Sequence, residues 1–200
     1  MSDGRPAGVR AMSRADVPAV VALQIAFLEG SMITELGSHF LTRFHAAALA
    51  HESTRALVAT GQDKSIVGFA LASSDVHGFN RYVKPRIVTA LAWSLLSVNG
   101  LTRGWRFLRA LTDLEPQPPI PAELLLLVVH QRARRQGIGQ GLVAALESDL
   151  ARDGIRRYRV AVRSQLDSAR AFYHALGFEL EQELAVLGQP MTYLTKRIVS

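Results

Sequence analysis

Apolar residues recur along the chain with two different spacings, which predict alternating strands and helices. The first half is expected to hold a short strand, two helices and a β-hairpin, at residues 9–12, 17–28, 38–51, 56–59 and 65–72. Ser13 or Asp16 is suited to cap the first helix, and Gly61 begins the turn of the hairpin.

The second half opens with an unusual amphipathic segment. Residues 78–112 have helical spacing in two pieces, and four prolines then predict an extended linker: Pro116, Pro118, Pro119 and Pro121. Residues 122–129 form a dense apolar run, which is typical of a strand buried on both faces. The remaining elements are expected to be a helix at 138–152, a strand at 155–162, a helix at 167–176 and strands at 178–184 and 191–198.

The composition indicates one folded domain over residues 1–200, with a helical insertion at about 78–121. A hydrophobic content of 48% is high enough to build a core. The chain has no cysteine, which excludes disulfides and cysteine-ligated zinc, so we expect no metal and a cytoplasmic location. The N-terminus lacks the apolar core of a signal peptide. The longest apolar stretch, residues 87–98, is shorter than the roughly 20 residues of a transmembrane helix.

A net charge of +6 at neutral pH leaves two interpretations of the binding partners open. A basic chain can bind nucleic acid or an anionic membrane surface, whereas a local basic site can bind a small polyanion. Most of the arginines are dispersed, and the densest run comprises Arg132, Arg134 and Arg135. The excess is modest for 200 residues, and outside this run a solvated basic surface explains it equally well, so we expect no nucleic-acid partner.

The strongest chemical signal is an Arg- and Gly-rich loop between the buried strand and the following helix. The first backbone N–H groups of a helix lack intrahelical acceptors and lie at the positive end of the helix dipole, so they can bind an anion. Gly137, Gly139 and Gly141 would let a pyrophosphate approach the backbone. Arg134 and Arg135 would add charged hydrogen bonds. The spacing fits neither a P-loop nor a G-x-G-x-x-G dinucleotide loop, and glycines needed only for close packing would also explain it.

A second signal lies in residues 169–180, where a short helix carries Phe172 and Tyr173 and a Gly-Phe pair begins a strand. Each of these aromatic residues alone is typical of a hydrophobic core. Together, R-x-x-G-x-G at 134–139 and A-x-x-F-Y-x-x-x-G-F at 169–178 resemble the GCN5-related N-acetyltransferase (GNAT) superfamily. Residues 35–41 are similar to a branch of bacterial members whose acceptors are unassigned.

The resemblance implies an α/β fold, in which a twisted, mixed and mainly antiparallel sheet is flanked by helices. It also implies direct transfer of an acetyl group from acetyl-CoA to a primary amine of a small molecule or peptide. The strand at 122–129 and the strand after the long helix are expected to separate and admit the pantetheine arm. The cofactor-binding residues implied are Leu127, Val128 and Val129 along the arm, and Arg134, Arg135, Gln136, Gly137, Ile138, Gly139 and Gln140 around the pyrophosphate.

Two residues are expected to carry the chemistry. The resemblance places Tyr173 near the thioester sulfur, where its hydroxyl would stabilise the leaving thiolate. The amine must lose a proton before it attacks, and Glu123 matches the glutamate of histone-acetylating members, so it is the candidate base. Leu166 stands where many members have an asparagine that contacts the cofactor, which puts that contact in doubt. Ala161 stands where the branch that acetylates ribosomal proteins has a glutamate, which argues against that branch.

Other functions stay open at this point. A catalytically silent acyl-CoA-binding regulatory domain would need the same loop, and turnover with a panel of amines would separate it from an enzyme. The insertion carries Arg103, Arg106 and Arg109 near Trp93 and Trp105, which also fits binding to nucleic acid or a membrane surface. Alternatively, the insertion walls the acceptor side of the cleft, or its apolar faces form a homodimer contact.

Overall fold

The computed structural model describes residues 8–28, 31, 33–95, 120–186 and 189–198. Its elements follow the order expected from the sequence. The strands are β1 (Val9–Ala11), β2 (Thr54–Thr60), β3 (Ile66–Ser73), β4 (Glu123–Val129), β5 (Arg157–Arg163), β6 (Glu179–Val186) and β7 (Gln189–Arg197). The α-helices are α1 (Val17–Phe27), α2 (Gly37–Leu49), α3 (Val76–Leu95), α5 (Ile138–Arg152) and α6 (Asp167–Ala175).

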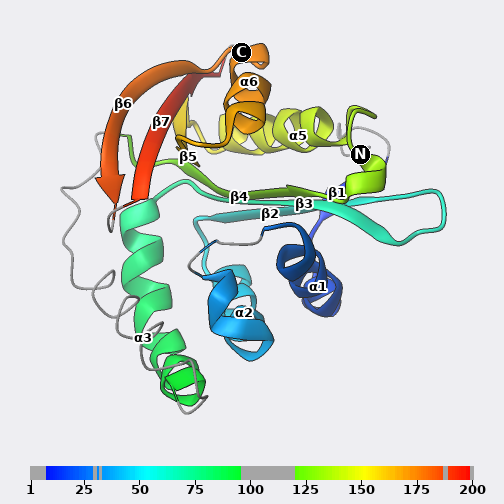
Figure 1. Ribbon diagram of the computed structural model, residues 1–200, viewed down its shortest axis with the longest axis vertical. Helices are drawn as coiled ribbons and strands as arrows, with labels where there is room; N and C mark the ends of the chain where they lie inside the picture. The colour runs from blue at the N-terminus through cyan, green and yellow to red at the C-terminus, as the bar shows by residue number, and fades with distance from the viewer. Residues whose placement is uncertain (1–7, 29–30, 32, 96–119, 187–188, 199–200) are drawn as a thin grey trace.

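The strands of the described residues form one seven-stranded sheet in the order β1-β2-β3-β4-β5-β7-β6. All neighbouring strands are antiparallel except β4 and β5, which are parallel. Helices α1, α2 and α3 lie on one side of the sheet, and α5 and α6 lie on the other (Figure 1). This arrangement confirms the expected fold class, a mixed and mainly antiparallel sheet flanked by helices.

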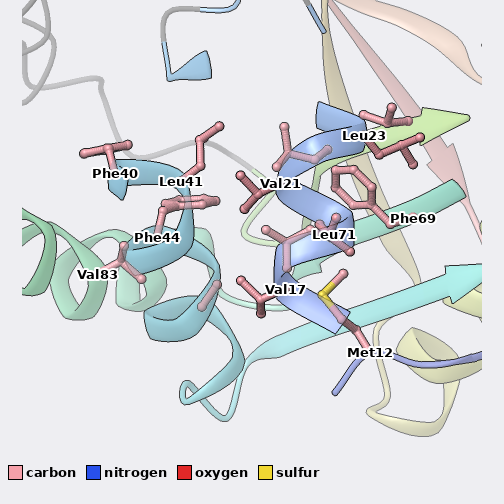
Figure 2. Close-up of a cluster of buried hydrophobic side chains, with 14 of the residues drawn as sticks. Met12, Val17, Val21, Leu23, Phe40, Leu41, Phe44, Phe69, Leu71 and Val83 are labelled. Carbon is pink, nitrogen blue, oxygen red and sulfur yellow. The ribbon is translucent and has the colours of Figure 1, made fainter. Parts of the chain in front are cut away.

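Two hydrophobic clusters hold the helices against the two faces of the sheet. The cluster on the first face joins Val17 and Val21 of α1 and Phe44 of α2 to Phe69 and Leu71 of β3 (Figure 2). The second cluster, which we call the α5-side cluster, packs α5 and α6 against β2 to β5 and β7. Because both faces of β4 are covered, its apolar residues run continuously instead of alternating with polar ones.

The inserted segment begins as a helix, α3, which starts two residues earlier than expected. A carboxylate oxygen of Asp75 accepts a hydrogen bond from the backbone N–H of Gly78, which caps the first turn. Phe79, Val83 and Ile87 pack into the cluster with α1 and α2. The expected second helical piece, with its arginines at 103–109, lies outside the described residues. None of the described helices is both long and apolar enough to cross a membrane.

Among the described strands, β6 forms one edge of the sheet and pairs only with β7. Most side chains of β6 are exposed, and Leu180 is 58% exposed. Its sequence, ELEQELAV, places glutamates at positions 179, 181 and 183. The exposed edge is thus acidic as well as apolar.

A polar pair is buried between α1 and α2. His45 is fully buried, and its Nε2 lies 2.7 Å from Oε1 of Gln24, which is also buried. Nδ1 of His45 has no hydrogen-bond partner among the described residues. Burial lowers the pKa of His45 to about 4, because the imidazolium would lose its hydration there.

His45 should make the protein less stable as the pH falls from about 6.5 to 4. The unfolded imidazole binds a proton near pH 6.5 and the folded one only near pH 4, so acid favours the unfolded state. Between pH 7.5 and 4.5 we expect a loss of about 2–3 kcal/mol from this residue. His45→Gln can keep the bond to Gln24 without titrating, so urea denaturation should show a smaller loss. His77→Gln, at an exposed site, is the control; equal pH dependence of wild type and His45→Gln would contradict this assignment.

Candidate functional site

Strands β4 and β5 are paired at one end only. The paired residues are Glu123 with Arg159 and Leu124 with Val160. Beyond them, β4 stays paired with β3 as far as Val129, and β5 stays paired with β7 along its whole length. The two strands therefore leave a split between them. Within the described residues, the β5-facing edge of β4 beyond Leu124 is open, and an extended ligand can pair with such an edge.

A β-bulge lies where the two strands separate. Leu125 is the extra residue, because Leu124 and Leu126 pair with consecutive residues of β3. Leu124 and Leu127 pack in the α5-side cluster, whereas Leu125 and Leu126 both pack on the opposite face. The bulge thus shifts the alternation of side chains, and it places Leu127 and Val129 on the face that α5 and α6 cover.

The loop after β4 leaves a row of backbone amides unused. The N–H groups of residues 135–140 donate to no carbonyl or side chain in the described part of the chain. The first backbone bond at the start of α5 runs from the N–H of Gly141 to the carbonyl of Gly137, at 2.8 Å. Arg135 and Gly137 are left-handed, with φ of 62° and 76°. Such conformations turn neighbouring amides toward a common point, and the helix dipole adds positive potential there, so the loop can bind an anion.

The two glycines at the start of α5 serve different purposes. A Cβ on Gly137 would meet no atom within 4 Å, so this residue borders open space. A Cβ on Gly139 would lie 3.2 Å from Cζ of Phe172 and 3.7 Å from Cγ2 of Val129. Gly139 therefore leaves room for Phe172 of α6 beside the start of α5, and its role in binding a pyrophosphate stays a prediction.

The side chains of Arg134 and Gln136 donate hydrogen bonds to backbone carbonyls in and next to the loop. Nε of Arg134 donates a hydrogen bond of 3.2 Å to the carbonyl of Val129, the last residue of β4. The guanidinium carbon lies 5.8 Å from the ring centre of Phe27 on α1. Nε2 of Gln136 donates to the carbonyl of Arg132 at 2.8 Å. These side chains hold the loop in shape, so part of their role is structural.

Tyr173 of α6 combines a buried ring with an accessible hydroxyl. The residue is 7% exposed, and its ring packs edge-on against Phe172 and Phe178, with centroid distances of 5.2 Å. Burial raises the pKa of Tyr173 above the ordinary value, so the phenol stays protonated at neutral pH. The hydroxyl makes no hydrogen bond to a described residue. Its oxygen is not one of the fully buried polar atoms, so it is accessible. Phe172, the neighbour of Tyr173 in α6, lies close to Gly139 at the start of α5.

Glu123, the predicted base, is already engaged in an ion pair. Its Oε2 accepts hydrogen bonds from Nε and Nη2 of Arg159, both at 2.7 Å. The guanidinium carbon of Arg159 lies 4.6 Å from the ring centre of Tyr193 on β7. Sequence analysis missed this pair, although charged residues within two apolar strands are a signal for one.

The remaining predictions concern Leu166, metal binding and the lining of a cavity. Leu166 is the residue before α6, 37% exposed, and its side chain makes no capping hydrogen bond. Within the described ranges, no group of three His, Asp or Glu residues could hold a metal ion. A cavity of about 750 Å³ is lined by residues of α3, among them Arg81, Tyr82 and Arg86, by Arg55 of β2 and by residues 51–53 and 74–75. None of the predicted catalytic or cofactor-binding residues lines it.

Comparison with known proteins identifies the family of the chain. The sequence model of the acetyltransferase (GNAT) family matches residues 24–178, well over half of the chain. The chain belongs to the GNAT family. It is therefore an acyltransferase of the acetyltransferase type. A comparison with curated protein sequences gives no significant match.

Several solved structures share the fold. The PaiA N-acetyltransferase of Thermoplasma acidophilum, solved with coenzyme A, is 15% identical with a TM-score of 0.62, over 94% of this chain and 97% of that one. A ribosomal-protein-alanine N-acetyltransferase of Brucella melitensis is 16% identical with a TM-score of 0.62, over 94% and 98% of the two chains. The protein SsHAT is 22% identical with a TM-score of 0.66, over 96% and 98%. These similarities establish the fold.

The close contact of Gly139 with Phe172 can be tested by a double-mutant cycle. Gly139→Val should destabilise the protein by about 1–3 kcal/mol, because the new side chain overlaps the phenyl ring. In a Phe172→Ala background the same substitution should cost far less, since the ring is gone. Thermal or urea denaturation of the four proteins measures the coupling. Costs that add without coupling would show that the two residues do not touch.

Proposed function

We propose that the GNAT domain takes acetyl-CoA as its donor and transfers the acetyl group directly to a primary amine. The row of unused amides at residues 135–140 carries this proposal. A pyrophosphate is the anion that such a row at a helix N-terminus can bind, and the open edge of β4 begins beside it. A ligand with a diphosphate followed by a peptide-like arm fits both features: the diphosphate would bind the amides, and the arm would pair with the open edge of β4.

The donor would be held by two sets of residues. The backbone of Leu127, Val128 and Val129 would pair with the amides of the pantetheine arm. The pyrophosphate would lie against the loop of residues Arg134, Arg135, Gln136, Gly137, Ile138, Gly139 and Gln140. In this loop the amides supply most of the hydrogen bonds, because Arg134 and Gln136 are partly occupied within the loop itself.

The transfer itself needs a neutral amine and a stabilised leaving group. An amine with a pKa near 10.4 must lose its proton, which costs about 4.6 kcal/mol at pH 7. Its nitrogen then attacks the thioester carbon, and the C–S bond breaks with the electron pair leaving on the sulfur. The nitrogen releases its extra proton to solvent and becomes the neutral amide nitrogen. The hydroxyl of Tyr173 donates a hydrogen bond to that sulfur. Because the pKa of Tyr173 is raised, the phenol keeps its proton, and the thiolate takes one from solvent.

The acceptor and the proton acceptor are the open parts of the proposal. The acceptor is a small-molecule or peptide amine, and Glu123 stays a prediction as the base. A cytoplasmic location and a homodimer likewise stay predictions. The alternative of a silent acyl-CoA-binding regulatory domain would bind the donor but release no thiol with any amine, so an acceptor screen read by thiol release separates the two.

Gly137→Ala should weaken the binding of acetyl-CoA. An alanine at φ of 76° is strained, and relief of that strain turns the neighbouring amides away from their common point. We expect the dissociation constant to rise at least about tenfold, measured by calorimetric titration. Gly154→Ala is a matched control, because Gly154 lies at the other end of α5 with φ of 78° and equally open surroundings. Equal affinities of the two folded variants would remove the loop from the donor site.

Tyr173→Phe should lower turnover by about 10- to 1000-fold with little change in the affinity for acetyl-CoA. The substitution keeps the packed ring and removes only the hydroxyl. Tyr158→Phe is the control, because Tyr158 is also a buried tyrosine, but its hydroxyl donates to Glu147 at 2.6 Å. That variant should lose stability and not turnover. If Tyr173→Phe releases thiol at the wild-type rate with an amine found by the screen, Tyr173 has a packing role only.

A further inference from the structure

The narrow end of the split between β4 and β5 is fastened by a buried ion pair. Glu123 and Arg159 are directly opposite residues, and they form one of the two residue pairs that hold the strands together. Two guanidinium nitrogens of Arg159 lie 2.7 Å from the same oxygen of Glu123. Only 12% of the Glu123 side chain and 5% of the Arg159 side chain are exposed.

The pair also has a defined direction and a third strand behind it. Leu124 and Val160, the next pair along the two strands, point into the α5-side cluster. Successive side chains of a strand point to opposite faces, so Glu123 and Arg159 project on the face away from α5. There the guanidinium lies against the ring of Tyr193, which ties β7 to the same point. The split is thus closed by contacts among three strands.

We propose that the Glu123–Arg159 pair forms the floor of the acyl site and limits the length of the acyl group that the enzyme accepts. This inference rests on the proposed function, in which the arm runs along β4 from the amides beyond Val129 toward Glu123. The acyl group then points at the place where the strands close. A longer acyl chain must separate the strands where Leu124 pairs with Val160, and this would pull the next pair, Glu123 and Arg159, apart.

The physical reason is that the pair cannot give way easily. Parting two buried charges that neutralise each other is far more costly than displacing an apolar side chain. A rigid pocket distinguishes one methylene by about 10- to 200-fold. Arg159 is therefore a specificity-determining residue that acts through Glu123. A structural role of the carboxylate competes with its predicted role as the base, and the variant Glu123→Gln separates the two.

The test replaces both charges and measures the affinity for three donors. Glu123→Leu with Arg159→Met removes the pair without leaving an unpaired charge, and such apolar replacements often preserve stability. Calorimetric titration with acetyl-, propionyl- and butyryl-CoA needs no acceptor. Wild type should bind propionyl-CoA at least about tenfold more weakly than acetyl-CoA, and butyryl-CoA more weakly still. In the double variant the differences should shrink to about threefold or less.

A second ion pair of the chain provides the matched control. Arg55 and Asp153 lie 2.6 Å apart, on β2 and just after α5, away from the split. Arg55→Met with Asp153→Leu should leave the ratios of the affinities for acetyl-, propionyl- and butyryl-CoA unchanged. If the double variant at the split fails to fold, Arg159→Lys replaces it. Lysine keeps the charge but cannot make both bonds to Glu123, so this variant should reduce the differences among the three affinities in part.

Three outcomes would overturn the inference. Unchanged affinity ratios in a folded variant at the split would show that the pair does not bound the acyl site. A loss of turnover in Glu123→Gln that is equal for all donors, with unchanged ratios of affinity, would make Glu123 the base. If wild type binds no CoA thioester at all, the proposed function fails first, and this result is distinct from the other two.

Discussion

The structure depends on one constraint, which is that β4 must be paired fully on one side and only in part on the other. Pairing with β3 as far as Val129 holds β4 in the middle of the sheet. The parting from β5 after two residue pairs leaves a backbone edge of β4 open, along which the proposed donor would lie. The bulge at Leu125 lies at the parting and turns the next side chains of β4 toward α5 and α6. The loop, the helix N-terminus and Tyr173 are all positioned from this strand.

Much of this arrangement could be predicted from the sequence, because periodicity and turn residues are local signals. Helix α5 has the expected bounds, and α1, α2 and α6 differ from theirs by one or two residues at either end. The loop at 134–140 was predicted from physical rules for helix N-termini. Its donor and the role of Tyr173 came from the resemblance to a family, since the same residues alone also fit a packed core.

The features that sequence analysis missed depend on contacts between distant segments. A run of leucines gives no sign of a bulge at Leu125, because every residue of the run is apolar on either face. The pairing of Glu123 with Arg159 depends on the register of two parallel strands, which a helix separates in the sequence. The role of Gly139 depends on a ring from α6. The early start of α3 was the exception, since Asp75 is a local capping signal that could have been recognised.

The acidic edge strand β6 has a consequence for the protein in concentrated solution. An open edge presents unpaired backbone groups, and a strand of another molecule can join them and begin aggregation. Glu179 and Glu183 are exposed on β6 and would bring negative charge close to that of a second copy, and a bulge at Glu181 interrupts the regular edge. Like charges opposite one another across a strand pair repel. The chain thus carries, in the sequence of one strand, its own protection against polymerising through this edge.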